Sequence, residues 1–466
     1  MRKRTRLYAL LGVLLVVCAA AFAVSRYEEQ KEQIKNSGET ILAIPTDSVT
    51  ALSWTNDSGT FSFTKDGRWV YDEDAAFPVD EEKIDDLLAQ FVSFAATFTI
   101  DDVTDLSLYG LDEPVCTIEI TAGEEHHTVT LGDISKMDEQ RYVSLGDGKV
   151  YLVAHDPLDE FGAVLRDMIL DDTIPSFDTA EEIAFSGSES YTILRDEDGK
   201  SLCADDVYFV DGQPLDTDNV DTFLNAVRAL RLTDYVSYDV SDEELTAFGL
   251  SDPDLTIRLT YRTDDDDGDA ADTGTLLLSV SRDPEEAAAY EEAVENDEDE
   301  LPDVTCYVRV GSSQIVYRIA QSEYDALTAV SYDTLRHQSL FTGDFDAVTS
   351  IDVVLDGESH TFTHAPSEDG DDAWTYDGES FDASDLEAAL CAVSADRFTE
   401  EEPTGQEEIS VTVHLDDEDF PTFTLTLYRC DGTNCIAAVD GTPVALVPRS
   451  QTVDLIEAVN ELTLGR

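Results

Sequence analysis

Basic residues are the main shortage in this chain, which has 28 Lys and Arg against 102 Asp and Glu and a formal net charge of −74. A surface of that sign repels nucleic acid and anionic lipid headgroups, so it argues strongly against a DNA- or RNA-binding role. Solubility, as in a secreted or halotolerant protein, is the simplest explanation of the acidity. The charge also leaves room for weak, unspecific binding of divalent cations by acidic loops.

Motifs that mark catalytic and cofactor sites are also missing. The chain has no Gly-rich phosphate loop, no Gly-x-Ser-x-Gly elbow, no His-Glu-x-x-His and no Cys-x-x-Cys. We therefore predict no catalytic, cofactor-binding or metal-binding residues, and a chain that is not an enzyme. A hydrolase with an unrecognised carboxylate pair stays open as an alternative, because so many carboxylates make chance pairs inevitable.

Cysteine is sparse as well, with seven residues in 466. Cys18 falls in the apolar N-terminal run, and the even number that remains permits disulfides without requiring them. Cys116 and Cys391 fall on apolar faces and are expected to be small core residues. Only Cys430 and Cys435 bracket a turn where a hairpin could bring two sulfurs together. The sequence leaves their disulfide state open.

Histidine and aspartate patterns predict no metal site. His126 and His127 are adjacent in an expected strand, so they point to opposite faces. His360 and His364 also lie in a strand pattern, roughly 13 Å apart, which is too far to share an ion. We expect both to face solvent. The acidic stretch that begins at Asp264 fails the EF-hand pattern, because threonine and leucine stand where ligands are needed.

The N-terminus carries the clearest localisation signal. Residues 1–6 form a basic flank, and Leu7–Val24 is a run of 18 residues without charge or proline, just long enough to span a bilayer. Basic flanks stay in the cytoplasm, so we predict a single-pass membrane protein with its C-terminal bulk outside the cytoplasm. Ala21-Phe-Ala23 is similar to a signal-peptidase site, and a cleaved signal peptide is the alternative. The length of the run favours a retained signal-anchor.

One passage recurs three times: an aromatic strand, a short turn, an aspartate at a helix-capping position, and one amphipathic helix. Such a recurrence usually means one folding unit used several times. Many short strands with one or two helices per unit indicate an α+β fold. We predict three tandem repeats, each an antiparallel sheet with a packed helix, on an N-terminal transmembrane helix. The matching positions are Trp69, Asp80 and Leu88; Tyr208, Asp216 and Leu224; and Trp374, Asp382 and Leu390.

A second pattern, aromatic-Gly-Leu-x-x-Pro, occurs at equivalent places in the first two units. The copies are Tyr109-Gly-Leu-Asp-Glu-Pro114 and Phe248-Gly-Leu-Ser-Asp-Pro253. The mechanical interpretation is a helix C-terminus, in which glycine takes a positive φ, leucine packs back and proline stops the helix. The alternative is a turn that binds a partner. We favour the mechanical interpretation, since each residue already has a structural role.

These signals define the predicted domain organisation. The second unit is longer than the first because it contains two acidic stretches, Asp264–Asp272 and Asp283–Asp303, which we predict to be exposed loops. The predicted segments are a cytoplasmic flank (1–6), a transmembrane anchor (7–24), a stalk (25–46), repeat unit 1 (47–176), repeat unit 2 with its acidic insertions (177–340) and a divergent repeat unit 3 (341–466).

With the basic flank, the apolar run and both aromatic-Gly-Leu-x-x-Pro motifs in view, the chain resembles the bacterial family labelled domain of unknown function 4340. Members of that family are often encoded beside ABC-2-type, gliding-motility-like transporters. The resemblance implies a protein of the bacterial cell membrane that assists a transporter outside the cytoplasm, with an ABC-type permease as its partner. It implies no catalytic residues.

Three functions of different classes follow. The first is a non-enzymatic, membrane-anchored accessory or scaffold protein associated with an ABC-type transporter. The second is a cell-surface binding module that contacts cell-wall polymer. The third is the uncharacterised hydrolase named above. Copurification with a permease would favour the first, binding to purified peptidoglycan the second, and hydrolysis that depends on one carboxylate the third.

Overall fold

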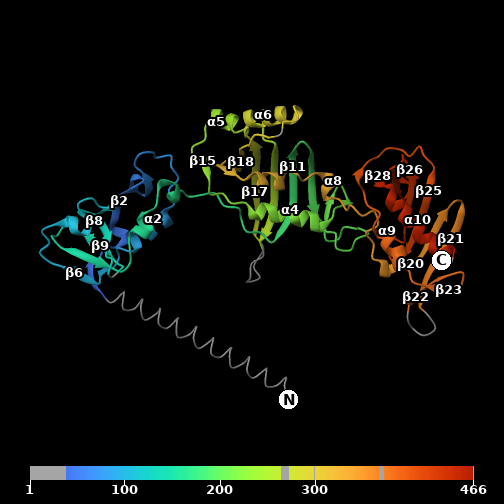
Figure 1. Cartoon of the computed structure of the whole chain (residues 1–466), viewed down its shortest axis with the longest axis horizontal. Helices are drawn as coiled ribbons and strands as arrows, with labels where there is room; N and C mark the ends of the chain where they lie inside the picture. Colours follow the sequence, from blue (N-terminus) through green and yellow to red (C-terminus); the bar gives the residue numbers. More distant parts are fainter. Residues whose placement is uncertain (1–37, 138, 264–271, 299, 367–371, 465–466) are drawn as a thin grey trace, which may run out of the picture. The chain divides into compact units, whose positions relative to one another are not determined.

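A computed structural model describes residues 38–137, 139–263, 272–298, 300–366 and 372–464 (Figure 1). The chain divides into two compact units, with the boundary between Asp171 and Asp172. The first unit contains one large sheet, called module 1 with its helices. The second contains two, called module 2 and module 3 in chain order. The predicted span at Leu7–Val24 lies outside the described residues, and no helix within them is long and apolar enough to cross a membrane.

Module 1 is built on an eight-stranded antiparallel sheet in the order β4-β3-β2-β7-β8-β9-β10-β6. The hairpin of β2 and β3 lies on one side of the sheet. Its strand β2 also pairs with β7, which comes later in the chain, after the helix of this module. A separate small sheet joins β1 (Glu39–Leu42) to β5 (Phe94–Ala96). The strands of the large sheet are β2 (Val49–Asn56), β3 (Gly59–Asp66), β4 (Arg68–Tyr71), β6 (Phe98–Ile100), β7 (Cys116–Ala122), β8 (Glu125–Ile134), β9 (Arg141–Ser144) and β10 (Val150–Val153).

Modules 2 and 3 repeat this strand order, with one short strand added at the hairpin edge of each. The predicted α+β class and antiparallel sheets are therefore confirmed. Module 2 has β11 (Thr179–Gly187), β12 (Ser190–Arg195), β13 (Tyr208–Val210), β14 (Gln213–Pro214), β15 (Tyr235–Ser237), β16 (Leu255–Thr263), β17 (Asp272–Arg282), β18 (Cys306–Val310) and β19 (Val316–Ile319). Module 3 has β20 (Val348–Leu355), β21 (Glu358–Pro366), β22 (Asp372–Tyr376), β23 (Glu379–Phe381), β24 (Arg397–Phe398), β25 (Glu407–Leu415), β26 (Thr422–Arg429), β27 (Asn434–Val439) and β28 (Thr442–Pro448).

Each module has the predicted helix between its first hairpin and its central strands. These helices are α2 (Glu81–Ala89), α4 (Thr217–Ala229) and α9 (Ser384–Cys391). The carboxylate of Asp80 accepts hydrogen bonds from the backbone of Glu82 and Lys83, and Asp216 caps α4 in the same way. In α9 the match is looser, since Asp382 accepts only from Ser384 and Ala383 is the capping residue. The matched leucines Leu88, Leu224 and Leu390 are all buried.

The aromatic-Gly-Leu-x-x-Pro motif ends a helical turn in both places. Gly110 has φ 66° at the end of η2 (Leu106–Tyr109), and Gly249 has φ 73° just after α5 (Asp242–Ala247). The backbone amide of Leu250 donates to the carbonyl of Leu245 at 2.8 Å, which closes the left-handed cap. The leucine that follows each glycine is buried. The mechanical interpretation of the motif is supported.

The closing helices differ from one another. In module 1, Asp156 and Pro157 are typical of a helix start, and a single helix to about Met168 would be expected there. Instead α3 (Leu158–Phe161) ends at Gly162, and a short 3-10 turn, η3 (Leu165–Met168), follows. Module 2 closes with α7 (Gln321–Thr328) and α8 (Tyr332–Leu335), and module 3 with the longer α10 (Arg449–Leu464). Short 3-10 turns, η1 (Thr46–Ser48) and η4 (Phe345–Ala347), precede the first strand of modules 1 and 3.

One predicted acidic loop is a helix. Within Asp283–Asp303 the chain forms α6 (Pro284–Glu295), which begins at a proline and is capped by the Asp283 carboxylate. The physical reason is local: proline fits the first turn, glutamates there favour the positive helix end, and three alanines have the highest helix propensity. Ala287 and Ala293 are buried, and Glu286 accepts a hydrogen bond from the Thr305 amide at 2.7 Å. The other stretch lies outside the described residues except for Asp272, which begins β17.

Four hairpins in modules 2 and 3 turn on the dipeptide Asp-Gly. In each pair both residues have positive φ, between 47° and 52° for the aspartates and between 79° and 85° for the glycines. Those angles match the type I′ turn, whose twist suits a two-residue hairpin. The turns join β13 to β14, β20 to β21, β22 to β23 and β27 to β28. Their residues are Asp211-Gly212, Asp356-Gly357, Asp377-Gly378 and Asp440-Gly441.

Candidate functional site

The histidines weighed from the sequence are held by neighbouring side chains or backbone. On β8, His126 Nδ1 lies 3.0 Å from the Thr121 hydroxyl, and His127 Nε2 lies 3.6 Å from a Glu125 carboxylate oxygen. The two point to opposite faces of their strand, as adjacent residues must.

His360 and His364 lie on β21. We predicted that both face solvent, and this prediction is wrong. Both are half-buried. His360 Nδ1 lies 2.8 Å from the Tyr376 hydroxyl, and the His364 ring stacks on Trp374 with centroids 4.9 Å apart. The difference arises because the neighbouring strand β22 supplies aromatic side chains beside them, which a strand pattern alone does not reveal.

Cys430 and Cys435 flank the β26–β27 turn, but both are free thiols. Cys430 is exposed and Cys435 is fully buried. The turn is held instead by Asp431, whose carboxylate accepts from the backbone amides of Thr433 and Asn434, each at 2.7 Å.

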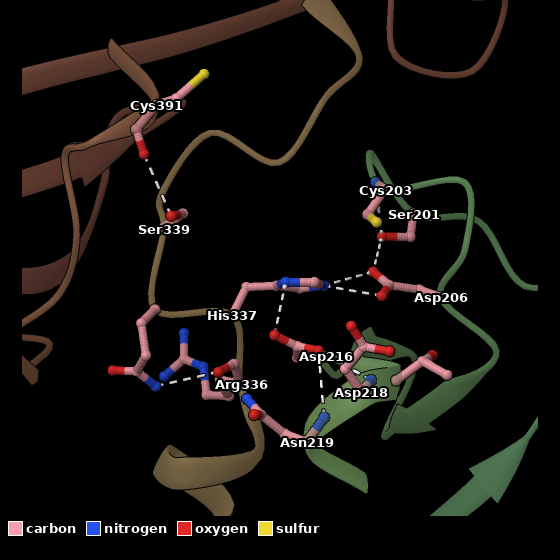
Figure 2. Close-up of polar contacts among 12 residues, drawn as sticks. Ser201, Cys203, Asp206, Asp216, Asp218, Asn219, Arg336, His337, Ser339 and Cys391 are labelled. Carbon is pink, nitrogen blue, oxygen red and sulfur yellow. Dashed lines mark hydrogen bonds and ion pairs between the residues drawn. The ribbon is translucent and has the colours of Figure 1, made fainter. Parts of the chain in front are cut away.

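A different group of residues forms the best-developed polar site, and Figure 2 shows it in module 2. Cys203 and Asp206 lie on the loop between β12 and β13. His337 lies just after α8, and its ring points toward that loop. Asp216, the residue that caps α4, approaches the ring from the other side. We call Cys203, Asp206, Asp216 and His337 the His337 cluster.

Asp206 is the anchor of the His337 cluster. Its side chain is only 1% exposed. One carboxylate oxygen accepts a hydrogen bond of 2.6 Å from the Ser201 hydroxyl, and His337 Nε2 lies 2.8 and 2.9 Å from the two oxygens. The other ring nitrogen, Nδ1, lies 3.5 Å from Asp216. A half-buried imidazole therefore sits between two carboxylates.

The charges in the His337 cluster are mutually dependent. The hydrogen bond to Asp206 raises the pKa of His337, and the negative charges of Asp206, Asp216 and Asp218 act in the same direction against the effect of burial. Burial raises the pKa of the Cys203 thiol, and Asp206 adds to that shift. The hydrogen bond and the nearby carboxylates therefore favour the protonated form of the His337 ring.

The same atoms are suitable metal ligands. Cys203, Asp206 and His337 each offer one ligand atom, and these three atoms lie within 4.8 Å of one another. Among the described residues, this is the group of three or more potential ligands placed closely enough to hold a metal ion. Thiolate, imidazole and carboxylate together form a donor set typical of Zn²⁺. Our prediction of no metal-binding residues did not identify this group, because Cys203 and His337 are far apart in the sequence. The short Cys203-x-x-Asp206 spacing was the only local signal.

The segment that carries His337 also contacts module 3. The Ser339 hydroxyl donates to the carbonyl of Cys391 at the end of α9, and the Leu340 amide donates to the carbonyl of Val393. On the other side of His337, the carbonyl of Leu335 accepts from the amide of Asp216. The His337 cluster therefore lies on the connection between two modules.

Comparison with known proteins places the chain in a family. Two overlapping regions, residues 69–253 and 210–410, match the family described as a domain of unknown function, DUF4340. The chain belongs to the DUF4340 family. The resemblance carried by the two aromatic-Gly-Leu-x-x-Pro motifs is confirmed. No curated protein and no solved structure matches the chain.

The two DUF4340 matches begin in equivalent strands, β4 of module 1 and β13 of module 2. Cys203 and Asp206 fall in the first match alone, His337 falls in the second alone, and Asp216 falls in both. The His337 cluster is therefore assembled across the two matched regions.

Proposed function

We propose that this chain is a non-enzymatic accessory or scaffold protein, anchored in the bacterial cell membrane and associated outside the cytoplasm with an ABC-type transporter. Its sequence supports the anchor, through the basic flank and the apolar run Leu7–Val24. Membership of DUF4340 adds support, because members of that family are often encoded beside such transporters. The structural observation that carries the proposal is an exposed apolar surface on module 1.

This surface consists of large apolar side chains that face solvent. Leu108 is 73% exposed and Met137 is 87% exposed. We call the set the module 1 patch: Phe98, Leu106, Leu108, Ile134 and Met137. Large apolar side chains left in solvent on neighbouring segments are candidates for an interaction surface.

Short contacts join the segments that carry the patch. Thr97, beside Phe98, donates a hydrogen bond to Gln140 in the connection that carries Met137. The end of β8, just before Ile134, abuts the end of η2, because a Cβ on Gly132 would lie 2.2 Å from the carbonyl oxygen of Tyr109. The three segments are therefore neighbours in the folded module.

Module 2 covers the equivalent surface, and this contrast favours a binding role in module 1. In both modules a ring from the aromatic-Gly-Leu-x-x-Pro motif packs on a strand tyrosine: Tyr109 on Tyr142, and Phe248 on Tyr307. In module 2 the helix α5 supplies Leu245 to a cluster with these rings. In module 1 the shorter η2 leaves its leucines in solvent.

The edge strands show the same difference. In module 2, Arg318 of β19 pairs with Asp234 at 3.6 Å, beside the edge strand β15. In module 1 the corresponding strand position holds Leu152, which lies opposite Phe98 of β6. An exposed ion pair in one module thus corresponds to an apolar pair in the other.

The position of the patch suits a partner in the membrane. β1 enters the fold by pairing Glu39 with Ala96, two residues before Phe98. Only 14 residues separate Val24, the end of the predicted anchor, from Glu39. At roughly 3.5 Å per residue they reach no more than about 50 Å. The nearby carboxylates of Asp101 and Asp105 already pair with Lys149 and Ser107, so we expect a partner surface that is mainly apolar.

The test is crosslinking of the full chain in native membranes, followed by mass spectrometry. The variants are Phe98→Asp and Leu108→Asp. Burying a carboxylate at an interface costs far more binding free energy than removing an apolar contact. Leu194→Asp is the matched control: Leu194 is 50% exposed on β12 in module 2. We expect the wild type and the control to capture an ABC-type permease, and the patch variants to capture at least tenfold less.

Two results would contradict the proposal in different ways. Equal capture by the patch variants, with unchanged melting temperatures, would mean that the patch is not the docking surface. Failure of the wild type to capture any permease would remove the transporter association. Binding of that wild type to purified peptidoglycan would then favour the cell-wall alternative.

A further inference from the structure

We propose that Cys203, Asp206 and His337 bind one divalent transition-metal ion of the zinc type, in a site that fastens the connection between modules 2 and 3. This inference concerns a separate site from the module 1 patch and does not depend on the proposed function. It rests on the identity of the ligands, the distances between them and the origin of each side chain.

The ligand set is the first argument. A sulfur, an imidazole nitrogen and a carboxylate oxygen converge within 4.8 Å. Hard cations such as Ca²⁺ and Mg²⁺ bind oxygen, and a thiolate with an imidazole selects zinc-like ions. Diffuse attraction by the acidic surface would not recruit a cysteine. In zinc sites with bonds of about 2.0 to 2.3 Å, neighbouring ligands are roughly 3.3 to 3.8 Å apart. The three side chains therefore need only small rotations.

The second argument is the orientation of the imidazole. His337 Nε2 faces Asp206, while Nδ1 faces the Asp216 carboxylate at 3.5 Å. A histidine that binds a metal usually donates its other N–H to a carboxylate, which fixes the ring and strengthens the ligand. Asp216 is in that position, and its own place is fixed because it caps α4. We assign Asp216 the role of a positioning residue.

The third argument is that the loop geometry is already fixed without the ion. Ser201 donates one hydrogen bond to Asp206 through its hydroxyl, and that hydroxyl accepts another from the amide of Cys203 at 3.2 Å. The Asp206 amide in turn donates to the Cys203 carbonyl at 3.2 Å. These bonds hold the sulfur and the carboxylate on one side of the ring. His337 is 21% exposed at its side chain, so solvent can supply a fourth ligand.

Binding exchanges protons for the ion. The metal replaces the proton that His337 Nε2 shares with Asp206, and the Cys203 thiol loses its proton to become a thiolate. The resulting bonds tie the β12–β13 loop to the segment after α8. Because that segment also bonds to Cys391 and Val393 of module 3, the ion would restrict the connection between the modules.

The experiment uses the full chain in detergent, reduced and freed of metal with a chelator. Calorimetric titration with Zn²⁺ should show one tight site per chain, which persists in a large excess of Ca²⁺. Titration with Co²⁺ should produce the near-ultraviolet absorption of a thiolate-to-cobalt charge transfer. Cys203→Ser should abolish that absorption and weaken Zn²⁺ binding by at least 100-fold.

Matched controls separate this site from the other thiols and from folding defects. Cys391→Ser changes another half-buried cysteine and should leave both signals unchanged. Asp216→Asn should keep the cobalt absorption but weaken Zn²⁺ binding by about 10- to 100-fold, the usual effect of losing such a partner. A cobalt absorption that survives Cys203→Ser, or Zn²⁺ binding that Ca²⁺ displaces, would overturn the proposal and leave the cluster as an ion pair only.

Discussion

Single aspartates decide much of the local structure in this chain. Asp80 and Asp216 cap their helices through side-chain hydrogen bonds, as the sequence predicts. Asp431 has a similar role in a turn, where two backbone amides and the Thr433 hydroxyl donate to one carboxylate. Those donors favour the ionised form and lower the pKa of Asp431 to about 2.

The turn at Asp431 should therefore respond to acid in a definite way. The pKa in the folded chain lies below the unfolded value of about 3.9. The stabilising contribution is thus complete above about pH 5 and is lost as the pH falls through about 2. At pH 3, carbon-detected NMR should find Asp431 still mostly ionised while ordinary exposed aspartates are mostly protonated. A titration midpoint near 3.9 would show that the two amides do not hold the carboxylate in solution.

The His337 cluster marks the limit of residue-scale prediction. A cap can be recognised because aspartate, turn and helix are consecutive in the sequence. Cys203 and His337 come together only after α4, the central strands and α8 have folded, so no spacing pattern connects them. The half-buried positions of His360 and His364 depend on β22 in the same way.

At the scale of elements, the recurring strand, turn and capping aspartate predicted the three repeated helices, whereas charge density led to one wrong prediction. The stretch Asp283–Asp303 has no clear apolar face, so we expected a loop. Helix propensity and capping are sufficient to make α6 there, with two alanines buried. The closing helix of module 1 shows the opposite error, because Gly162 ends α3 early.

The glycine of the aromatic-Gly-Leu-x-x-Pro motif gives an element-scale prediction. A Cβ at Gly249 would lie 2.4 Å from the Ser281 hydroxyl and 2.7 Å from the carbonyl oxygen of Arg282. Gly249→Ala should therefore destabilise the fold in two ways, because alanine disfavours a left-handed backbone and its Cβ would clash with these atoms. Gly311→Ala is the control, since Gly311 has φ 52° and no atom within 4 Å of such a Cβ. We expect Gly249→Ala to cost about 1 to 3 kcal/mol more in urea unfolding. Equal costs would mean that the packing around this cap is not restrictive.

At the scale of the whole molecule, one strand order recurs in three sheets, and the sequence repeat anticipated it. The family matches follow the same division, since each begins in the aromatic strand of a repeated passage. The repeat could be predicted because strand, cap and helix are short-range features. Differences between surface residues at equivalent positions, such as Phe98 in module 1 and Asp234 in module 2, can be recognised only when the sheets are compared.

Localisation is the remaining whole-molecule prediction. We expect the mature protein to keep its first 24 residues and to remain in the membrane after alkaline washing, because Leu7–Val24 is apolar throughout. Leu14→Arg should release part of the protein, since a charge at the centre of a span costs about 3 kcal/mol. Mass spectrometry of the purified chain decides the question: a mature N-terminus at Val24 would establish a cleaved signal peptide instead.

The Asp-Gly hairpins have a consequence for the order of folding. A two-residue turn with preset positive φ lets its strands find each other within microseconds, without help from distant parts of the chain. The pairings of β11 with β16 and of β20 with β25 must instead close a loop that contains a whole helix. We therefore expect hairpins to form first in modules 2 and 3 and the central strand pairs to form last. Until they do, each half-module leaves an unpaired strand exposed, so completing one module before the next begins to fold would limit wrong pairing between modules.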